Sequence, residues 1–447
     1  MTTVDGIVSG LDTTALINAI LTAQSVPIAT MKVQVSDYEK QKEAVAGVKG
    51  RFTTLSDTIK TIDTAAEFQA YKVESSSSQV AVTASSGAIA GSYAIQVDNL
   101  ASAETSVSQG YDDKSAATLG TGTFSVTVGG VQTDLTIDGT NNSLQGLADA
   151  LSGVDGLAAY VIDTGATTGR YKLMVQGLST GAANSLEFDA SALTGGTAPA
   201  FTENTSAVDA TVQISGVTIH VASNTLDGAI PGIRIDLLQK GTTADTVKVT
   251  EDHDAMREKF KAVIDSFNAA IDYYAQQTVY NLDQDIRGPL VGEATTRRAV
   301  EDLGLMASNR YTVADTSFQA LSMIGVSTGR DGKLTLDTAK FDAAFDDDPD
   351  GMVTFLTSTD GPLGVMASRI DELYVDSDTG SLVNRQEGLE STISDLNDSI
   401  AAAEDRMDSY AKILRDQFTA METVLGQIQS TQGYLTSFFA ASTTASK

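Results

Sequence analysis

Residues 389–435 read LESTISDLNDSIAAAEDRMDSYAKILRDQFTAMETVLGQIQSTQGYL, and their apolar side chains recur every seven positions. One line consists of Ile393, Ile400, Met407, Leu414, Met421, Ile428 and Leu435. A second line consists of Leu389, Leu396, Ala403 and Tyr410, and it shifts by one position to Phe418 and Leu425. A period of 3.5 residues sustained over several heptads predicts a long helix with a narrow apolar seam that needs a partner helix.

The N-terminal end carries a matching seam. The same seven-residue spacing separates Met31, Tyr38, Val45, Phe52 and Ile59. A shorter helix is predicted before this seam, with Asp12 as its N-cap and with Leu11 and Leu16 placed as a hydrophobic staple. Pro27 is expected to break or kink the path between the two helices, because a proline inside a helix loses a hydrogen bond and clashes with the preceding turn.

The two terminal seams are expected to pair, with one helix running out, one running back, and the rest of the chain inserted between them. One interpretation is an intramolecular hairpin that needs no partner. The other is that the outer parts of both helices associate between subunits. The continuation of both seams towards the chain ends favours the second interpretation, since isolated helices are marginal in water.

The pattern between residues 71 and 250 changes to period two, with Gly, Ser and Thr at the turns. This alternation predicts strands at residues 80–84, 92–97, 104–108, 124–128, 131–137, 159–162, 171–176, 210–214, 217–221, 233–238 and 246–250. Gly129-Gly130 indicates a two-residue hairpin turn, and Ser143 is expected to cap a short helix. Residues 193–205 are predicted to form a loop. We interpret this region as two β-rich lobes, the second inserted in the first.

Helices are expected again after residue 251. A face with a 3.6-residue period contains Met256, Phe260, Val263, Ile264, Phe267, Ile271 and Tyr274. The prediction is therefore an α+β multidomain protein whose terminal helices pair as a coiled coil. Its parts are terminal coiled-coil helices (1–40 and 401–447), a helical leg domain (41–70 and 251–400), a β-rich head domain (71–108 and 206–250) and a second, inserted β-rich head domain (109–205).

Composition excludes several classes of function. The 447 residues include 29 Lys and Arg against 58 Asp and Glu, a net charge of −29, which disfavours nucleic acid and anionic lipid as partners. The absence of Cys excludes disulfide scaffolds, thiolate metal sites and Cys nucleophiles. No uninterrupted apolar run is long enough to span a bilayer, and no basic residue precedes Lys32, so neither membrane insertion nor a secretory signal is expected. A protein of this kind would leave the cell by another export route.

Two stretches match the G-x-S-x-G pattern of serine hydrolases, at residues 177–181 and 325–329. That nucleophile elbow requires a strand, a sharp turn and then a helix, together with a distant His. The segment after Ser179 is predicted to be a strand, and no His follows Ser327. We therefore interpret both matches as chance in a chain rich in Gly, Ser and Thr.

The spacing Asp346-x-Asp348-x-Asp350-Gly351 opens like a calcium loop, but position twelve is Thr357 rather than the required Glu. The preferred interpretation is an acidic turn between helices in which Gly351 adopts a positive φ. Neither His220 nor His253 has metal-ligand spacing. We expect no catalytic residue, no metal site and no cofactor, and hence no enzyme.

Several stretches together resemble the flagellar filament cap protein family, also called hook-associated protein 2. The N-terminal SGLDT at residues 9–13, followed by Pro27-Ile28, resembles the opening of that family. Further similar stretches are GSYAIQV (91–97) with Leu100-Ala101, the inserted module at 122–186, Ser223-Asn224 with Pro231-Gly232, LSMIGV (321–326) through DGKLTLD (331–337), and QFTAME (417–422). Glu422 replaces the commoner Asp of the family, a difference to which we attach no consequence.

The resemblance implies a non-enzymatic assembly factor that leaves by the flagellar type III export apparatus with an export chaperone. It also implies a homo-oligomeric ring, usually of five subunits with four or six as alternatives, at the extracellular tip of the flagellum, where exported flagellin is held, folds and inserts. The seam residues expected to contact other subunits or flagellin are Leu11, Leu16, Ile20, Met31, Leu414, Phe418, Met421, Leu425 and Ile428. Two alternatives remain: a tip adhesin that binds host glycans, and another flagellar axial protein such as the hook–filament junction.

Overall fold

The computed structural model describes residues 9–75, 77–284 and 286–444. The chain divides into two units, which we name the helical unit (Met1–Ala65 with Arg257–Lys447) and the β unit (Ala66–Met256). Long terminal helices and several β-sheets confirm the predicted α+β multidomain class. The finer division into four parts remains a prediction.

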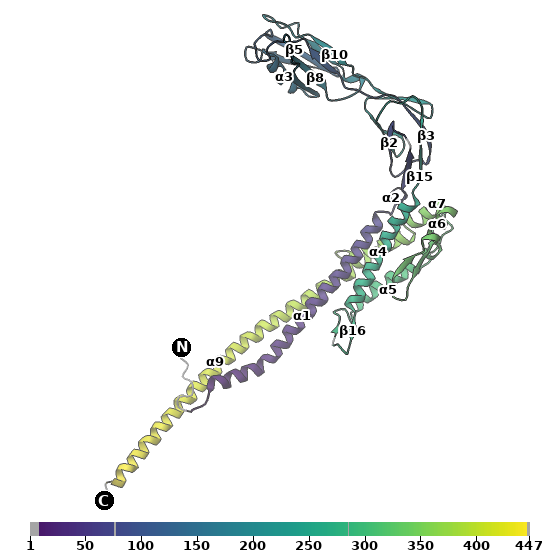
Figure 1. The fold of residues 1–447 in the computed structure, drawn as a ribbon. Helices are drawn as coiled ribbons and strands as arrows, with labels where there is room; N and C mark the ends of the chain where they lie inside the picture. The colour runs from purple at the N-terminus through teal and green to yellow at the C-terminus, as the bar shows by residue number, and fades with distance from the viewer. Residues whose placement is uncertain (1–8, 76, 285, 445–447) are drawn as a thin grey trace. The chain divides into compact units, whose positions relative to one another are not determined.

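The helical unit is built around two long helices, α1 (Thr13–Lys60) and α9 (Ser381–Thr444). They lie side by side and run in opposite directions (Figure 1). A buried cluster of Ile28, Val35, Ile393 and Ile400 joins them, flanked by Met31, Tyr38, Leu396, Ala403 and Met407. The two predicted seams therefore bury one another.

The prediction of a separate, shorter helix that ends at a break near Pro27 is wrong. α1 continues through Pro27, which is exposed, while Ile28 beside it is buried. A proline removes one backbone hydrogen bond and costs about 3 kcal/mol inside an isolated helix. Here Ile28 and Val35 pack against α9 on the turns that follow the proline, and burial of each such side chain stabilises by about 1.5–3 kcal/mol. Tertiary packing therefore holds the helix together across the proline.

The remaining helices of the helical unit include α4 (His253–Gln277), which begins at the end of the β unit, then α5 (Ala294–Ser308), α6 (Thr338–Asp347), α7 (Pro349–Thr357) and α8 (Pro362–Ile370). Helices therefore return after residue 251 as predicted, and α4 carries the predicted face with a 3.6-residue period. A single π-helical turn, η3 (Asp371–Val375), follows α8. Short pieces complete this unit: β16 (Tyr280–Asn281), β17 (Ile286–Arg287), η2 (Leu321–Ile324), β18 (Val326–Thr328) and β19 (Leu334–Leu336). Its core contains the fully buried rings of Phe52, Phe260, Phe267, Phe341, Phe345 and Phe355.

One close approach shapes this core. A Cβ built on Gly47 of α1 would lie 1.9 Å from the hydroxyl oxygen of Tyr273 on α4. The guanidinium of Arg51 lies over the same tyrosine ring, 5.7 Å from its centroid. Gly47 therefore has a packing role, because any larger side chain would displace the Tyr273 ring from beneath Arg51.

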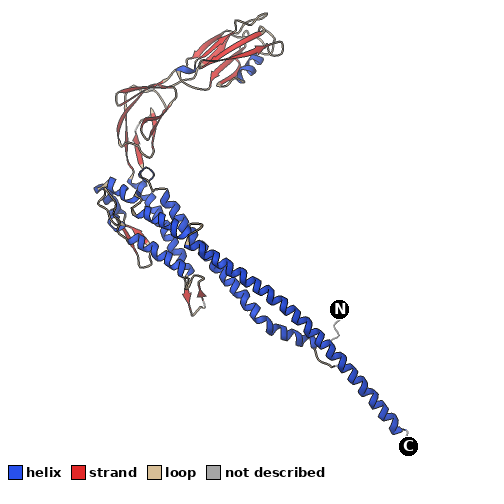
Figure 2. Ribbon diagram, turned by 180° about the vertical axis from the view of Figure 1, so that it is seen from behind, coloured by secondary structure: helices blue, strands red, loops and turns tan. Residues whose placement is uncertain are grey.

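The β unit contains two hydrophobic cores, and its strands stand out in red in Figure 2. The first lobe consists of the strands around the first core: β1 (Tyr71–Ser75), β2 (Val80–Ala84), β3 (Gly91–Asn99), β11 (Ala210–Ile214), β12 (Val217–Val221), β13 (Thr225–Ile230), β14 (Ile233–Leu237) and β15 (Asp245–Glu251). The order β1-β15-β3-β11-β12 forms one sheet and β13-β14-β2 another. The short helix α2 (Ala65–Phe68) precedes this lobe.

The second lobe lies between β3 and β11 in the chain. It contains β4 (Thr105–Ser108), β5 (Gly122–Val128), β6 (Val131–Ile137), α3 (Leu144–Ser152), β7 (Leu157–Asp163), β8 (Tyr171–Gly177), η1 (Ala182–Asn184), β9 (Leu186–Asp189) and β10 (Phe201–Thr205). Its sheets have the orders β10-β4-β8-β7 and β6-β5-β9. Gly129 and Gly130 have φ of 55° and 82°, as the predicted tight hairpin requires, and the Ser143 hydroxyl caps α3.

Two local expectations fail in this lobe. Residues 193–205 were expected to form a loop, but Phe201–Thr205 forms β10, which pairs with β4. Small residues around this strand give no local strand signal. The strand is stabilised by tertiary contacts instead: its pairing with β4 and the stacking of Phe201 on Phe188, whose ring centroids lie 4.2 Å apart. In addition, β4 pairs with β8 and β10, although its residues lie on the first-domain side of the predicted boundary at residue 108.

Candidate assembly interface

The register of the α1–α9 pair is marked by cross-helix ion pairs. Lys32 pairs with Glu404 at 2.7 Å, and Lys42 pairs with Glu390 further along. All four charged groups lie at the border of the buried seam, where exposed ion pairs contribute little, about 0–1 kcal/mol. They therefore define the register while the apolar cluster supplies the stability.

The N-terminal end of the pair is closed by Ser9 and Glu422. The Ser9 backbone N–H donates to Oε2 of Glu422 at 3.3 Å, and the Ser9 hydroxyl donates to Oε1. Glu422 is only 6% exposed. The expectation that Glu422 in place of Asp has no consequence is wrong, because its carboxylate binds Ser9 and so holds the segment that enters α1.

The start of α1 follows the predicted capping pattern. Asp12 is the N-cap, and its Oδ1 accepts from the backbone N–H of Ala15 at 2.7 Å. The staple residues Leu11 and Leu16 flank this cap but remain 54% and 46% exposed. Thr13 and Ile17 are buried instead, so the start of α1 turns a different face inward from the one that the staple suggested.

The nine predicted seam residues fall into three classes of burial. Leu414 is buried, at 7% exposure. The half-buried residues are Ile20, Met31, Phe418, Met421 and Leu425. Leu11, Leu16 and Ile428 are exposed. The structure brings Met31 into the buried α1–α9 cluster, whereas the exposed members project from the two ends of the predicted seam.

Beyond Glu422, α9 continues without α1 beside it (Figure 1). Its apolar side chains are exposed there: Val424 by 53%, Ile428 by 56%, Tyr434 by 69% and Leu435 by 47%. A shallow groove of about 500 Å³ lies on this stretch, lined by Val424, Gln427, Ile428, Thr431, Gln432 and Leu435. Scattered exposed apolar residues are ordinary, but a heptad line of them on one helix is typical of a surface that another helix covers.

The outer half of α1 is also apolar and exposed. No charged residue lies between Asp12 and Lys32. Within the described residues α1 is the one helix that is long and apolar enough to cross a membrane, with an 18-residue window of mean hydropathy 1.3, of which 11% is buried. Core helices of soluble proteins and signal sequences meet the same criterion, so the expectation of no membrane insertion remains a prediction.

The G-x-S-x-G stretches lie in turns and strands. Ser179 is exposed in the turn after β8, followed by the short 3₁₀ helix η1 and strand β9 rather than by a long helix. Ser327 lies in β18, where its hydroxyl is 2.8 Å from that of Thr335. Neither position has the strand–turn–helix geometry of a nucleophile elbow.

The acidic stretch at residues 346–351 caps a helix. Asp348 is the N-cap of α7, and its Oδ1 accepts from the backbone N–H of Gly351 at 3.0 Å. The expectation of a positive φ at Gly351 is wrong, because this residue lies in the first turn of α7. A Cβ there would approach Oδ2 of Asp348 to 2.0 Å, so the cap itself explains the glycine.

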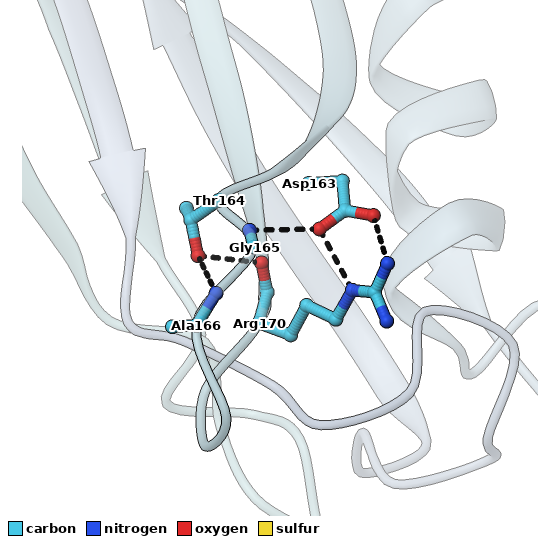
Figure 3. Close-up of polar contacts among 5 residues, drawn as sticks. All are labelled: Asp163, Thr164, Gly165, Ala166 and Arg170. Carbon is cyan, nitrogen blue, oxygen red and sulfur yellow. Dashed lines mark hydrogen bonds and ion pairs between the residues drawn. The ribbon is translucent and has the colours of Figure 1, made fainter.

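The most strongly shifted exposed carboxylate is also structural. Arg170 donates through Nε and Nη2 to the two oxygens of Asp163, both at 2.8 Å, across the β7–β8 connection (Figure 3). These bonds and the Gly165 N–H lower the pKa of Asp163 to about 2. Among the described residues, no three His, Asp or Glu side chains gather as metal ligands. The helical seams therefore remain the candidate site.

Comparison with known proteins identifies the relatives of this fold and interface. Residues 9–104 match the family model for the N-terminus of flagellar hook-associated protein 2, and residues 207–430 match the model for its C-terminus. The chain is 28% identical to flagellar hook-associated protein 2 of Escherichia coli K12, over 97% of both chains. It is 25% identical to the B-type flagellar hook-associated protein 2 of Pseudomonas aeruginosa, over 96% of both chains.

A solved structure agrees with this assignment. The crystal structure of the D1, D2 and D3 domains of the flagellar cap protein FliD from Escherichia coli superposes with a TM-score of 0.66 at 27% identity, and it covers 78% of this chain and 99% of its own. The two family models together include α1, α9 as far as residue 430 and the strands of the first lobe. This chain therefore belongs to the flagellar hook-associated protein 2 family.

Proposed function

We propose that this protein caps the distal end of the bacterial flagellar filament, where it promotes the folding and insertion of exported flagellin and prevents its loss. The observation that carries the proposal is the exposed heptad line on α9 beyond Glu422, continuous with the line that α1 covers. A relative described as hook-associated protein 2, matched over 97% of this chain, and a solved flagellar cap protein that covers 78% of it support the proposal.

The proposed cap is a homo-oligomeric ring, a pentamer, at the extracellular tip of the flagellum. The terminal helices (1–40 and 401–447) would form coiled coils with neighbouring copies or with flagellin. The proposal also includes a leg domain (41–70 and 251–400) and two head domains, with β4 assigned to the second head domain. Leu16, Ile20, Phe418, Leu425 and Ile428 would supply apolar contacts. An apolar seam that is covered only on assembly can gain order when its partner binds. Export through the type III apparatus with a chaperone completes the proposal, and no catalytic role is included.

The test is a strain that lacks this gene. Monomeric flagellin in the medium is measured beside filament length, with and without added purified protein. Abundant leaked flagellin and absent filaments, both restored by the purified protein, would support the capping role. Normal filaments with little leakage would contradict it. Glycan binding by the full chain or growth of long straight filaments from the purified protein would then favour the adhesin or another axial role.

A further inference from the structure

The turn between β8 and β9, at residues 177–184, contacts the first lobe from within the second lobe. The hydroxyl of Thr180 donates to the carbonyl oxygen of Ala222 at 2.6 Å. The backbone N–H of Ala182 donates to Oδ1 of Asp209 at 2.8 Å, and that of Gly181 donates to the carbonyl of Ser102 at 3.2 Å. This turn is the first of the two G-x-S-x-G matches, and neither the core of its own lobe nor the assembly interface accounts for these bonds.

Gly181 is the tightest point of this contact. It is buried, its φ is 105°, and a Cβ on it would lie 2.6 Å from the Cβ of Ala222 and 2.9 Å from its carbonyl oxygen. A side chain here is excluded twice, by the backbone conformation and by the backbone of the other lobe. Only glycine therefore fits at this position without moving the backbone of Ala222.

The turn is also fixed at its base. Glu104, which is 6% exposed, accepts from the backbone N–H of Leu186 at 2.8 Å through Oε2 and from the Ser106 hydroxyl at 3.0 Å through Oε1. Its backbone carbonyl accepts from the N–H of Gly177 at 2.9 Å. Both ends of the turn are thus bonded to the chain segment that enters the second lobe, so the turn cannot swing independently.

Two other connections join the lobes. They are the segments at residues 100–104 and 206–209, which pair with each other through a bridge between Ser102 and Val208. A narrow two-stranded ribbon of this kind twists and bends easily. The turn adds a third attachment at Ala222 in the first lobe, and it also bonds both connections, at Ser102 and Asp209. Because the turn is held at its own base, these contacts remove that freedom.

We infer that the turn at residues 177–184 is a latch that holds the two β lobes in one relative orientation, with Gly181 as its essential residue. The latch makes the lobes move as one body, and it accounts for Thr180 and Gly181 in a motif that otherwise resembles a catalytic turn. This inference is independent of the proposed function.

The chain has no cysteine, so Thr167→Cys in the second lobe and Thr218→Cys in the first lobe, both exposed, provide two unique sites for spin labels. Double electron–electron resonance on the full chain measures their distance distribution. We expect one narrow peak in the parent pair and loss of that peak, with a broad distribution, after Gly181→Val. Gly195→Val is the matched control, because Gly195 has φ of 77° but nothing within 4 Å of its Cβ, and it should keep the narrow peak.

Thr180→Val provides a second variant if Gly181→Val fails to fold by circular dichroism. It keeps the shape of the side chain and removes only the hydroxyl that bonds Ala222, so it should also broaden the distribution. A broad distribution in the parent pair, or a narrow peak retained in the folded latch variants, would overturn the inference.

Discussion

Arg385 on α9 donates from Nε to Oε1 of Glu293 at 3.1 Å, while Oε2 of the same carboxylate caps α5 by accepting from the backbone N–H of Thr296 at 2.6 Å. Nη2 of Arg385 also donates to Oε1 of Gln41 on α1 at 3.3 Å. The largely buried carboxylate of Glu293 therefore joins α5 to α9, and Arg385 extends the link to α1. Burial by itself raises the pKa of Glu293, but hydrogen bonds from Thr296 and the charge of Arg385 together lower the pKa below its ordinary value.

Replacing this carboxylate should destabilise the helical unit in a pH-dependent way. A carboxyl group whose pKa is lowered by folding stabilises the fold above the pKa of the unfolded chain, and the contribution disappears as the pH falls through the folded-state pKa. Glu293→Gln should therefore cost about 1–2 kcal/mol at neutral pH. This cost should begin to fade as the pH falls below about 4.3, the ordinary pKa of glutamate. Thermal unfolding followed by circular dichroism at 222 nm measures this. Glu387→Gln, an exposed change of the same charge on α9, is the control, and a pH-independent cost would refute the assignment.

Two glycines three positions apart on α1 should respond differently to alanine. A Cβ added at Gly50 has nothing within 4 Å, so Gly50→Ala should stabilise the fold by about 0.5–1 kcal/mol, the usual gain in helix propensity. Gly47→Ala should fail to stabilise, because its Cβ displaces the ring of Tyr273. In a Tyr273→Ala background the gain at position 47 should return. The measurement is the same thermal unfolding, and equal gains at both glycines in the unmodified background would contradict the packing role.

Ile413 and Leu414 are neighbouring apolar residues of α9 that differ in burial. Leu414→Asp places a charge at a position with 7% exposure and should loosen the α1–α9 pair by several kcal/mol, whereas Ile413→Asp, at 51% exposure, should change its stability by less than about 0.5 kcal/mol. Motility and filament length in a complemented deletion strain should fall with Leu414→Asp, while the β unit stays folded. Wild-type motility with Leu414→Asp would count against a role of the pair in capping.

The exposed end of α9 gives the sharpest test of assembly. Ile428→Asp should leave the unfolding temperature nearly unchanged, since this residue is 56% exposed, yet reduce filament assembly strongly if a partner helix covers it. Ser430→Asp is the control with the same charge, because residue 430 is exposed and lies outside both heptad lines. Equal leakage of flagellin from both variants would show that the apolar line is not the contact surface.

Asn224 pairs with the backbone of Ala101 through both halves of its amide. Its Oδ1 accepts from the Ala101 N–H at 2.7 Å, and its Nδ2 donates to the Ala101 carbonyl at 2.9 Å. Asn224→Asp should destabilise the first lobe by about 1–3 kcal/mol at neutral pH, because a carboxylate cannot donate to that carbonyl. Acidification should restore much of the loss by returning a donor. Urea unfolding of the full chain at two pH values measures this, and the absence of acid rescue would show that the pairing is not the cause.

Local patterns were sufficient for the elements that local chemistry controls. Asp12, Ser143 and Gly129-Gly130 act where their short-range hydrogen bonds or φ angles predict, and the heptads correctly indicate that the two ends pair. The expectations that fail depend on distant partners. Pro27 lies inside a helix because its neighbours pack on α9. Phe201 lies in a strand because its segment pairs with β4. Gly351 is a glycine because Asp348 caps the helix there, and its φ is not positive.

The candidate interface was likewise predicted in part from the sequence and decided in part by tertiary contacts. The seven-residue spacing identifies Leu414 and Ile428 as members of one seam, since periodicity is a property of the chain alone. The spacing cannot show that Leu414 is buried and Ile428 exposed, because burial depends on where the partner helix begins. The Ser9–Glu422 contact sets that point, so Leu414 is covered by α1 while Ile428 is left for a partner. The contacts of Glu422, Glu293 and Gly181 likewise arise from residues brought together only by folding, and no local pattern contains them.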